Sequence, residues 1–510
     1  METVLIDGIH LTLPQIDLVA QGEASVALSP EAHTRVLAAR KIIEEILERK
    51  QTVYGVNTGF GKLSEVKIEP AQVNELQLNL IRSHAAGVGA PYSVPVTRAI
   101  MLLRANVLAK GNSGVRPELV WLLLEMLNRN VHPVIPSRGS VGASGDLAPL
   151  AHLALVLIGE GKAETQSQIL PGSVALEKNG LRPVVLEAKE GLALINGTQA
   201  MTGSGCLSWQ RAMHLVRIAD VTGAMSLDVM KGTDTAFDQR IVQVRPHPGA
   251  IRVARNLRNL MKGSTIRESH RNSTHKVQDQ YSLRCMPQVH GAVRDALEVA
   301  EKWISIEINA ATDNPLVFAE DHVLLSGGNF HGAPMALCFD FLAIALSQLA
   351  CISERRIALL LDSAQSELPP FLSHDPGLHS GFMMAQVTTA ALASENKILA
   401  HPASVDTIPT SANKEDHVSM GVTAAIKLQQ IVENTANILA IEMLCASQAV
   451  DLLAPMKTSP ALLEAHKAFR ERVSEMKSDR VLADDIESAG KVLYDKAFFA
   501  RIEAVLGHSL

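Results

Sequence analysis

The stretch Val141-Gly142-Ala143-Ser144-Gly145-Asp146-Leu147-Ala148-Pro149 is the starting point for interpreting the whole sequence. It follows a run rich in proline and glycine, and it opens an apolar helical pattern that extends to Ile158. The ordinary interpretation is a loop followed by the start of a helix. Asp146 or Ser144 is then the N-cap, and Pro149 lies in the first turn, where its missing N–H costs nothing.

The tripeptide Ala143-Ser144-Gly145 also allows a chemical interpretation. Ser144 carries a β-hydroxyl, and its neighbours are the two least bulky residue types. In a tight bend the Gly145 nitrogen can reach the Ala143 carbonyl carbon, because glycine has no Cβ and tolerates unusual φ angles. Loss of two waters, one of them carrying the Ser144 hydroxyl, leaves a five-membered ring with an exocyclic methylene. That ring is an electrophile, which no ordinary side chain supplies.

The longer segment 139–152, Gly-Ser-Val-Gly-Ala-Ser-Gly-Asp-Leu-Ala-Pro-Leu-Ala-His, resembles the prosthetic-group loop of the aromatic amino acid ammonia-lyases. In that family Ala-Ser-Gly cyclises to 4-methylideneimidazol-5-one (MIO), and no dissociable cofactor is needed. An isolated Ala-Ser-Gly is common, so the resemblance depends on the long match and on further motifs over most of the chain.

Those further motifs resemble the catalytic and binding segments of the same family. They are residues 54–62 (Tyr-Gly-Val-Asn-Thr-Gly-Phe-Gly-Lys), 83–84, 191–200, 277–285, 326–332 and 411–420. For catalysis the resemblance implies Ala143, Ser144 and Gly145 as the MIO precursor, with Tyr54 and Tyr281. For substrate binding it implies His84, Asn196, Gln278, Arg284, Phe330 and Glu415. No metal ligand is among the implied residues.

The reaction that the resemblance implies is difficult for ordinary side chains. A base must remove a β-proton that is scarcely acidic, and an amine is a poor leaving group unless an electrophile is bonded to it. Tyr54 resembles the family's catalytic tyrosine, which is proposed to take the β-proton. A free tyrosine has a pKa near ~10, so positive dipoles or charges must lower it for this role. The helix start after Gly145 offers N–H donors that stabilise charge pushed into the ring.

The choice of substrate depends on His84 and Glu415, where the phenylalanine and tyrosine enzymes of this family carry other residues. Glu415 can accept a hydrogen bond from an imidazole N–H, and a site built around such a bond rejects an analogue that lacks it. The resemblance therefore implies elimination of ammonia from L-histidine to give trans-urocanate, the first step of histidine degradation. A tyrosine or phenylalanine lyase, or an aminomutase, is the alternative within the family. Lys414 departs from the glutamine that many relatives carry.

Several of these side chains also have a purely structural interpretation. Asn196 can cap a helix, Arg284 can be a solvated surface charge, and Phe330 can be plain core. Asn413 as N-cap, with Glu415 in the first turn, is a good helix start.

Length and composition favour a mainly α fold. The chain has 510 residues, of which 47% are hydrophobic and only 4% aromatic, so aliphatic residues must fill the core. Three long apolar patterns, 289–309, 334–361 and 422–454, are typical of a helical bundle. We expect a globular N-terminal domain over 1–110. An elongated bundle domain over 111–510 carries the loop 142–146, and the resemblance implies an aspartase/fumarase-like bundle.

Shorter patterns predict helices over 71–84, 97–110 and 117–129, and a helical stretch from Gly191 through Met230. Residues 163–190 have strand-like or irregular character and predict a surface excursion.

Charge and composition disfavour nucleic-acid binding, secretion, membrane insertion and disulfide formation. The formal net charge is −6, without the basic excess of a nucleic-acid-binding surface. The first residues carry acids and no basic region typical of a secretory signal. The uncharged runs 191–210 and 376–394 are too polar for a membrane span. Five scattered cysteines predict reduced thiols in a cytoplasmic protein.

Other classes of protein fit the sequence less well. A serine hydrolase elbow needs Gly-x-Ser-x-Gly, and Asp146 stands where its last glycine belongs. A metalloenzyme is disfavoured because no HExxH motif occurs and the histidines do not cluster. A non-catalytic helical scaffold explains the bundle but not the loop. The resemblance further implies a homotetramer with active sites shared between subunits.

Overall fold

The computed structural model describes residues 2–49, 51–59, 61–63, 66–272 and 277–510. Its contacts divide the chain into two compact units. Unit 1 comprises Met1–Gln210, Ala300–Asp340 and Pro402–Lys427, and unit 2 comprises Arg211–Val299, Phe341–His401 and Leu428–Leu510. This grouping differs from the expected boundary at residue 110. Residues 111–210, with the loop 142–146, group with the N-terminal residues because helices on both sides of residue 110 pack on one another.

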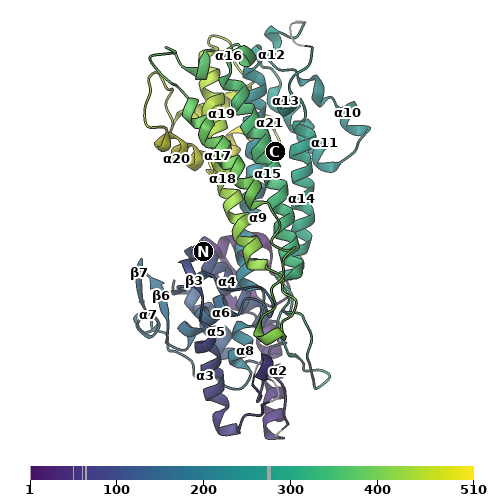
Figure 1. Cartoon of the computed structure of the whole chain (residues 1–510), viewed down its shortest axis with the longest axis vertical. Coiled ribbons are helices and arrows are strands. Elements are labelled where there is room, and N and C mark those ends of the chain that lie inside the picture. The colour runs from purple at the N-terminus through teal and green to yellow at the C-terminus, as the bar shows by residue number, and fades with distance from the viewer. Residues whose placement is uncertain (1, 50, 60, 64–65, 273–276) are drawn as a thin grey trace. The chain divides into compact units, whose positions relative to one another are not determined.

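Unit 1 is built from short helices with small sheets at its periphery (Figure 1). Its helices are α1 (Leu13–Ala20), α2 (Pro30–Glu48), α3 (Val73–His84), α4 (Val94–Ala109), α5 (Pro117–Asn128), α6 (Leu147–Leu157), α7 (Gly172–Lys178) and α8 (Glu190–Ile195), with the 3-10 turns η1 (Gly61–Leu63), η2 (Pro70–Gln72) and η5 (Ser411–Asn413). Its strands are β1 (Glu2–Ile6), β2 (Ala24–Leu28), β3 (Val88–Pro91), β4 (His132–Pro133), β5 (Pro136–Arg138), β6 (Lys162–Thr165), β7 (Gln168–Pro171), β8 (Leu316–Phe318) and β9 (Val323–Leu325).

The strands form four small sheets. β1 and β2 pair in parallel, while β3–β5, β4–β6–β7 and β8–β9 are antiparallel. Helix α4 is buried around almost its whole circumference, including Arg98, Arg104 and Asn106, as expected of a helix at the centre of a core. It packs against α1, α2 and α5, so α4 is the centre around which unit 1 is arranged.

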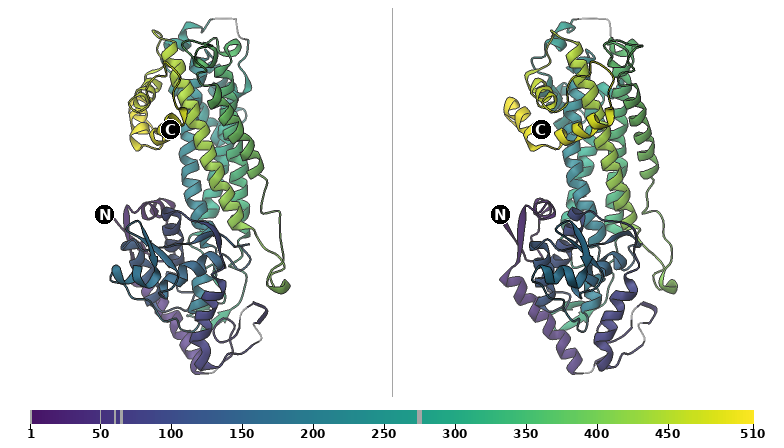
Figure 2. Two further views of the ribbon diagram at one scale, coloured as in Figure 1. Left: turned by 60° about the vertical axis from the view of Figure 1, so that its left-hand side comes forward. Right: turned by 90° about the vertical axis from the view of Figure 1, so that its left-hand side faces the viewer.

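Unit 2 is dominated by long helices. Figures 1 and 2 show α14 (Met286–Glu307), α15 (Ala333–Leu361), α17 (Met383–Leu399) and α18 (Gly421–Leu452) running side by side with α9 (Gln199–Val229). The remaining elements are η3 (Asp234–Phe237), α10 (Gln239–Gln243), α11 (Pro248–Met261), α12 (Thr265–Ser269), α13 (Tyr281–Arg284), α16 (Ser363–Ser366), η4 (Pro370–Leu372), α19 (Pro460–Arg470), α20 (Leu482–Leu493) and α21 (Lys496–Leu506). The predicted mainly α fold with a long helical bundle is confirmed.

A buried polar cluster joins the helices of unit 2. The carboxylate of Glu442 accepts hydrogen bonds from Arg356, from Ser353 at 2.6 Å and from Ser226 at 2.8 Å. Because a buried carboxylate without partners is costly, this arrangement is favourable only when α9, α15 and α18 are in register.

The helical stretch expected from Gly191 through Met230 is interrupted. α8 ends at Ile195 and α9 begins at Gln199, so the intervening residues Asn196, Gly197 and Thr198 form a turn between two helices. Asn196 is the C-cap of α8 rather than an N-cap. The turn exposes the first backbone N–H groups of α9 toward neighbouring segments of unit 1.

Among the described residues, one helix is long and apolar enough to cross a membrane by length and composition. It is α15, whose most apolar window has a mean hydropathy of 2.0, and 67% of that window is buried within the structure. The core helix of a soluble protein has the same properties.

Candidate active site

The loop before α6 is held from outside its own segment. The backbone N–H of Met420 donates to the Val141 carbonyl at 2.8 Å, and the Ser419 hydroxyl donates to the Gly142 carbonyl at 3.0 Å. Ala143 is only 5% exposed and packs against Met420 and Val418. The loop therefore has a fixed conformation even though it carries no regular secondary structure.

Gly145 lies against the turn between α8 and α9. It has φ +74°, and a Cβ at this position would collide with the Gly197 carbonyl. The next residue, Asp146, donates its backbone N–H to that same carbonyl at 2.7 Å. Only glycine satisfies both the backbone angle and the close approach. Gly145 is therefore fixed in a conformation and packing that no larger residue can adopt.

Asp146 is the N-cap residue of α6, but its side chain makes no capping hydrogen bond there. Its carboxylate instead accepts from the N–H of Met201 at 2.8 Å, in the first turn of α9, and from the Ser140 hydroxyl at 3.1 Å. Complete burial raises the pKa of Asp146 to about 7, although these donors oppose the shift. Asp146 therefore fixes the tripeptide between two helix N-termini, whose N–H groups favour negative charge.

A cavity of about 500 Å³ opens beside Ser144, within the range of small-molecule sites. Six predicted site residues line it: Tyr54, His84, Ser144, Asn196, Phe330 and Glu415. The other lining residues are Gly59, Gly61, Leu63, Leu76, Asn79, Leu80, Ser83, Leu147, Leu192, Ile195, Asn314 and Ser411. Ala143 and Gly145 flank Ser144 but do not line the cavity. All of these residues belong to unit 1.

Glu415 is directed into the cavity and hydrogen-bonded through both oxygens. Its Oε1 accepts from the Ser144 hydroxyl at 2.6 Å, and its Oε2 accepts from Thr410 at 2.6 Å and Ser411 at 2.9 Å. Burial alone would raise the pKa of Glu415, but the three hydroxyl donors and the nearby His84 outweigh burial and lower it. The side chain is therefore a carboxylate, an acceptor only, near neutral pH. Glu415 does not begin a helix with Asn413 as N-cap; it closes a tight turn through a bridge to Thr410.

His84 is the last residue of α3, and its ring lines the same cavity. Nδ1 lies 2.9 Å from the Leu80 carbonyl one turn earlier, so the proton on Nδ1 donates to that carbonyl and Nε2 is an acceptor. Burial lowers the pKa of His84, despite the opposing effects of the carbonyl and Glu415. The imidazole is therefore neutral at pH 7.

Tyr54 lies on the glycine-rich loop and lines the cavity. Burial raises its pKa, and the negative charges of Glu415 and Asp313 raise it further. A tyrosine that acts as a base needs a lowered pKa, so unit 1 alone does not supply the positive charge that would let Tyr54 take a proton. An Asn57 side chain holds the loop, because it accepts from the Val53 N–H at 2.9 Å and donates to the Gln51 carbonyl at 2.8 Å.

Asn196 connects the cavity with the buried polar interior of unit 1. Its Nδ2 donates to the Asn314 carbonyl at 3.0 Å, while its own carbonyl accepts from the buried Arg104 at 2.8 Å. Among the residues that the structure describes, its Oδ1 has no hydrogen-bond partner although it is buried. A buried acceptor without a partner at a cavity wall is suited to a ligand donor.

Gln278, Tyr281 and Arg284 do not line this cavity; they belong to unit 2. Tyr281 is 71% exposed, and the Arg284 guanidinium lies over its ring, 4.8 Å from the centroid. These three predicted residues are thus together on one segment, separate from the six that line the cavity.

The structure adds residues that the sequence argument did not select. Thr410 and Ser411 hold Glu415, and the fully buried Lys189 pairs with Asp313 at 2.9 Å near the Tyr54 loop. A lysine between acidic residues in a polar segment gave no sequence signal of complete burial. Thr410 precedes the recognised motif 411–420 and Ser411 begins it, but ordinary loop hydroxyls look the same in sequence.

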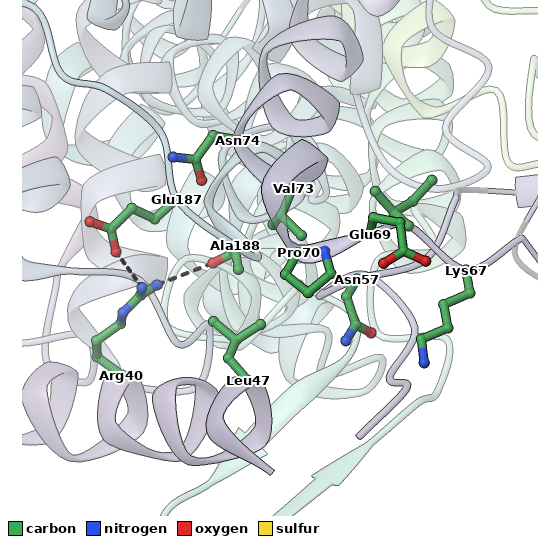
Figure 3. Close-up of a pocket in the computed structure, with 11 residues that line it drawn as sticks. Arg40, Leu47, Asn57, Lys67, Glu69, Pro70, Val73, Asn74, Glu187 and Ala188 are labelled. Atoms are coloured by element: carbon green, nitrogen blue, oxygen red, sulfur yellow. Dashed lines mark hydrogen bonds and ion pairs between the residues drawn. The ribbon is translucent and has the colours of Figure 1, made fainter. Parts of the chain in front are cut away.

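A second cavity of about 430 Å³ lies beside Asn57 and Lys67, which follow Tyr54 in the chain (Figure 3). Its buried cation is Arg40, which already pairs with Glu187 at 2.5 Å and donates to the Ala188 carbonyl at 3.1 Å. Asn57, Lys67 and Glu69 lie along its opposite wall (Figure 3). This cavity contains none of the predicted site residues. No group of three or more side chains able to hold a metal ion occurs within the described ranges.

Comparison with known proteins assigns the class. A model of the aromatic amino acid lyase family matches residues 11–471, so this chain belongs to that family. The histidine ammonia-lyase of Anaeromyxobacter sp. (strain K) is 55% identical over 501 residues, covering 97% of this chain and 99% of the relative. That of Myxococcus xanthus is 53% identical, covering 98% of each chain.

Solved structures agree with this assignment. The histidine ammonia-lyase of Trypanosoma cruzi superposes with a TM-score of 0.92 at 43% identity, covering 99% of this chain and 96% of the other. A tyrosine aminomutase from Streptomyces globisporus superposes with a TM-score of 0.93 at 40% identity, covering 98% of each chain. The fold is therefore shared by family members with different reactions, and the site must distinguish between them.

Proposed function

We propose that this chain eliminates ammonia from L-histidine to give trans-urocanate, the first step of histidine degradation. The observation that carries the proposal is the Glu415 carboxylate, held ionised in the same cavity as Ser144 and His84. An imidazole N–H can donate to this carboxylate, and a phenyl ring cannot. The near-full-length relatives named histidine ammonia-lyase support the same substrate.

We further propose that Ala143, Ser144 and Gly145 cyclise without help from another protein to form MIO. The Gly145 nitrogen bonds to the Ala143 carbonyl carbon, and two waters leave, one with the carbonyl oxygen and one with the Ser144 hydroxyl. The buried Ala143, the Gly145 conformation and the two adjacent helix N-termini fit this group. The ring supplies an electrophilic methylene that makes the substrate amine a better leaving group.

The residues that line the cavity have separate roles in this proposal. His84 and Glu415 bind the substrate imidazole, Phe330 packs beside the reacting groups, and the unpaired Oδ1 of Asn196 accepts from a donor in the cavity. Tyr54 takes the β-proton. Since burial raises its pKa within one chain, its ionisation requires positive charge from elsewhere.

We propose that this charge comes from a neighbouring subunit of a homotetramer. Gln278, Tyr281 and Arg284 are implied by the family resemblance, yet they belong to unit 2 and line no part of the cavity. The exposed Tyr281 is available for such a contact. In the assembled site Arg284 binds the substrate carboxylate through two parallel hydrogen bonds and lowers the pKa of Tyr54.

A cytoplasmic location is part of the proposal. Its support is the use of cysteine: the five thiols are scattered and free, and three of them are buried. Buried thiols behave as small apolar side chains and need no oxidising compartment.

The alternative within the family is a tyrosine or phenylalanine lyase or an aminomutase, and the relatives named histidine ammonia-lyase favour the histidine reaction over it. One experiment decides between them. Purified protein is given L-histidine, L-tyrosine and L-phenylalanine in parallel, and ultraviolet absorbance and amino acid products are recorded. The proposal predicts that histidine yields urocanate and ammonia in equal amounts. Preferential formation of an aromatic acrylate or a β-amino acid would overturn it.

A further inference from the structure

The turn that carries Glu415 is closed on itself by backbone hydrogen bonds. The Thr410 N–H donates to the Glu415 carbonyl at 3.0 Å, and the Lys414 N–H donates to the Ser411 carbonyl at 3.2 Å. Thr410 and Glu415 thus lie opposite each other as an isolated antiparallel bridge. The residues between them have to reverse direction within four positions.

The reversal is made by three consecutive residues in the left-handed region. Ser411, Ala412 and Asn413 have φ of 51°, 53° and 65°. Asparagine tolerates this region, but serine and alanine rarely adopt it. Such strained conformations persist only where surrounding bonds determine them, and they cluster at functional sites. The strain here coincides with the bridge that orients Glu415.

As a consequence of the turn, the two oxygens of Glu415 accept hydrogen bonds from different groups. Oε2 accepts from Thr410 at 2.6 Å and from Ser411 at 2.9 Å, so two donors occupy it. Oε1 accepts from the Ser144 hydroxyl at 2.6 Å, and because that hydroxyl leaves when the tripeptide cyclises, Oε1 then becomes available to a donor in the cavity that Glu415 lines. Ser411 lines the cavity, but Thr410 does not, so Thr410 acts through Glu415 alone.

We propose that Thr410 and Ser411 are positioning residues whose hydroxyls hold Oε2 of Glu415, so that Oε1 is presented to a substrate ring that bears an N–H group. This inference rests on the proposed function and deepens it, because it assigns substrate selection to a clamp outside the recognised site residues. Glu415 without the clamp has free rotation about its terminal bonds. It then pairs less well with imidazole, since an ordered acceptor loses less conformational entropy on binding.

The clamp also has a signature in the pH dependence. The groups that face Glu415 in the mature site are His84 and Tyr54, together with the two clamp hydroxyls, because the Ser144 hydroxyl leaves when the tripeptide cyclises. Removal of a hydroxyl donor raises the pKa of Glu415, because hydrogen bonds to a carboxylate favour its charged form. The acid limb of the kcat/KM profile for histidine then moves to higher pH. The substrate's own imidazole titrates at higher pH than Glu415 in every variant, so the shift is measured as the pH at which the acid limb steepens further below that titration.

The test compares Thr410→Val, Thr410→Ser and wild type. Thr410→Val keeps the shape and removes the hydroxyl, and we expect kcat/KM for histidine to fall at least about tenfold, the usual effect of a lost hydrogen bond to a charged group. The acid limb moves to higher pH, and Thr410→Ser restores both properties. Intact mass of each variant shows that the tripeptide matures normally. In the Glu415→Gln background, Thr410→Val changes kcat/KM less than about twofold, because the two residues act as one unit.

Two matched variants keep the result unambiguous. Ser411→Gly removes the second hydroxyl where φ already suits glycine, so it folds and gives the same direction of change. Thr407→Val removes a hydroxyl from the same segment whose partner is the Val418 N–H, so the acid limb stays in place. If the wild type is active and Thr410→Val and Ser411→Gly have unchanged kinetics, the clamp is overturned but the proposed function is not. A wild type that makes no urocanate from histidine would overturn the proposed function and the clamp together.

Discussion

The carboxylate of Asp146 accepts the N–H of Met201 at 2.8 Å, so the residue that begins α6 satisfies the first turn of α9 instead. The Asp146 side chain thereby caps the first turn of α9. A second contact, from the Asp146 backbone N–H to the Gly197 carbonyl at 2.7 Å, joins the end of the tripeptide 143–145 to the turn after Asn196. The acid is completely buried, and its pKa is about 7.

Asp146→Asn tests this contact through the pH dependence of stability. The pKa of Asp146 is raised from 3.8 to about 7 in the folded state, so its contribution is fully present below about pH 4 and is lost as pH rises through 7. Asparagine keeps an acceptor but does not titrate. We therefore expect the free energy of unfolding of the wild type to fall relative to the variant by up to about 3 kcal/mol as pH rises from 5 to 8, measured through the difference in their Tm values. A difference independent of pH would contradict a buried, titrating Asp146.

Glu415→Gln tests the assignment of the imidazole contact. The amide has no negative charge and presents a donor as well as an acceptor, so it pairs less well with a ring N–H. We expect kcat/KM for histidine to fall about 10- to 100-fold, with a smaller effect on residual turnover of phenylalanine. The measurement is the ratio of the two values in wild type and variant. Unchanged preference for histidine would show that Glu415 does not select the substrate.

Lys189 and Asp313 form an ion pair that is fully buried in unit 1. Lys189→Met removes the cation and leaves a buried carboxylate without its partner, which costs about 3–5 kcal/mol. We expect a clear loss of thermal stability, measured as Tm, and partial recovery in the double variant Lys189→Met/Asp313→Asn. Two single variants as stable as the wild type would mean that the pair is not buried in the folded enzyme.

The positions of the long helices could largely be predicted from the sequence, because apolar residues recur in them at helical spacing. The patterns 334–361 and 422–454 correspond to α15 and α18 within two residues. The pattern through Met230 failed at Asn196-Gly197-Thr198, because the helical stretch was continued across this polar Asn-Gly turn signal. The domain boundary at residue 110 remains a prediction, although contacts group the chain differently.

The sequence motifs predicted the part of the site whose residues all belong to unit 1. Ser144, Glu415 and His84 lie far apart in sequence and line one cavity. Thr410 was missed because its role depends on three left-handed residues that are not glycine, a conformation that no local pattern indicates. The direction of the Tyr54 pKa was also unpredictable, since it depends on burial and on the nearby Glu415 and Asp313 carboxylates, which arise only on folding.

The shared active site is tested by complementation between two inactive chains. Tyr54→Phe and Tyr281→Phe each remove one hydroxyl from the proposed site, and we expect each homotetramer to lose most activity. Co-expression with two different affinity tags yields hybrid tetramers, in which some sites contain both native tyrosines. These hybrids should regain a measurable fraction of wild-type turnover. Hybrids as inactive as their parents would argue that each chain completes its own site.

The central claim is that Ala143, Ser144 and Gly145 close into a ring and lose two waters. Intact-mass spectrometry of the purified, active protein tests it most directly, with Ser144→Ala as the control that cannot form the methylene. The account predicts a wild-type mass two waters below the encoded mass, and a Ser144→Ala protein that folds, lacks that loss and makes no urocanate. An active wild-type chain at its full encoded mass would contradict the account.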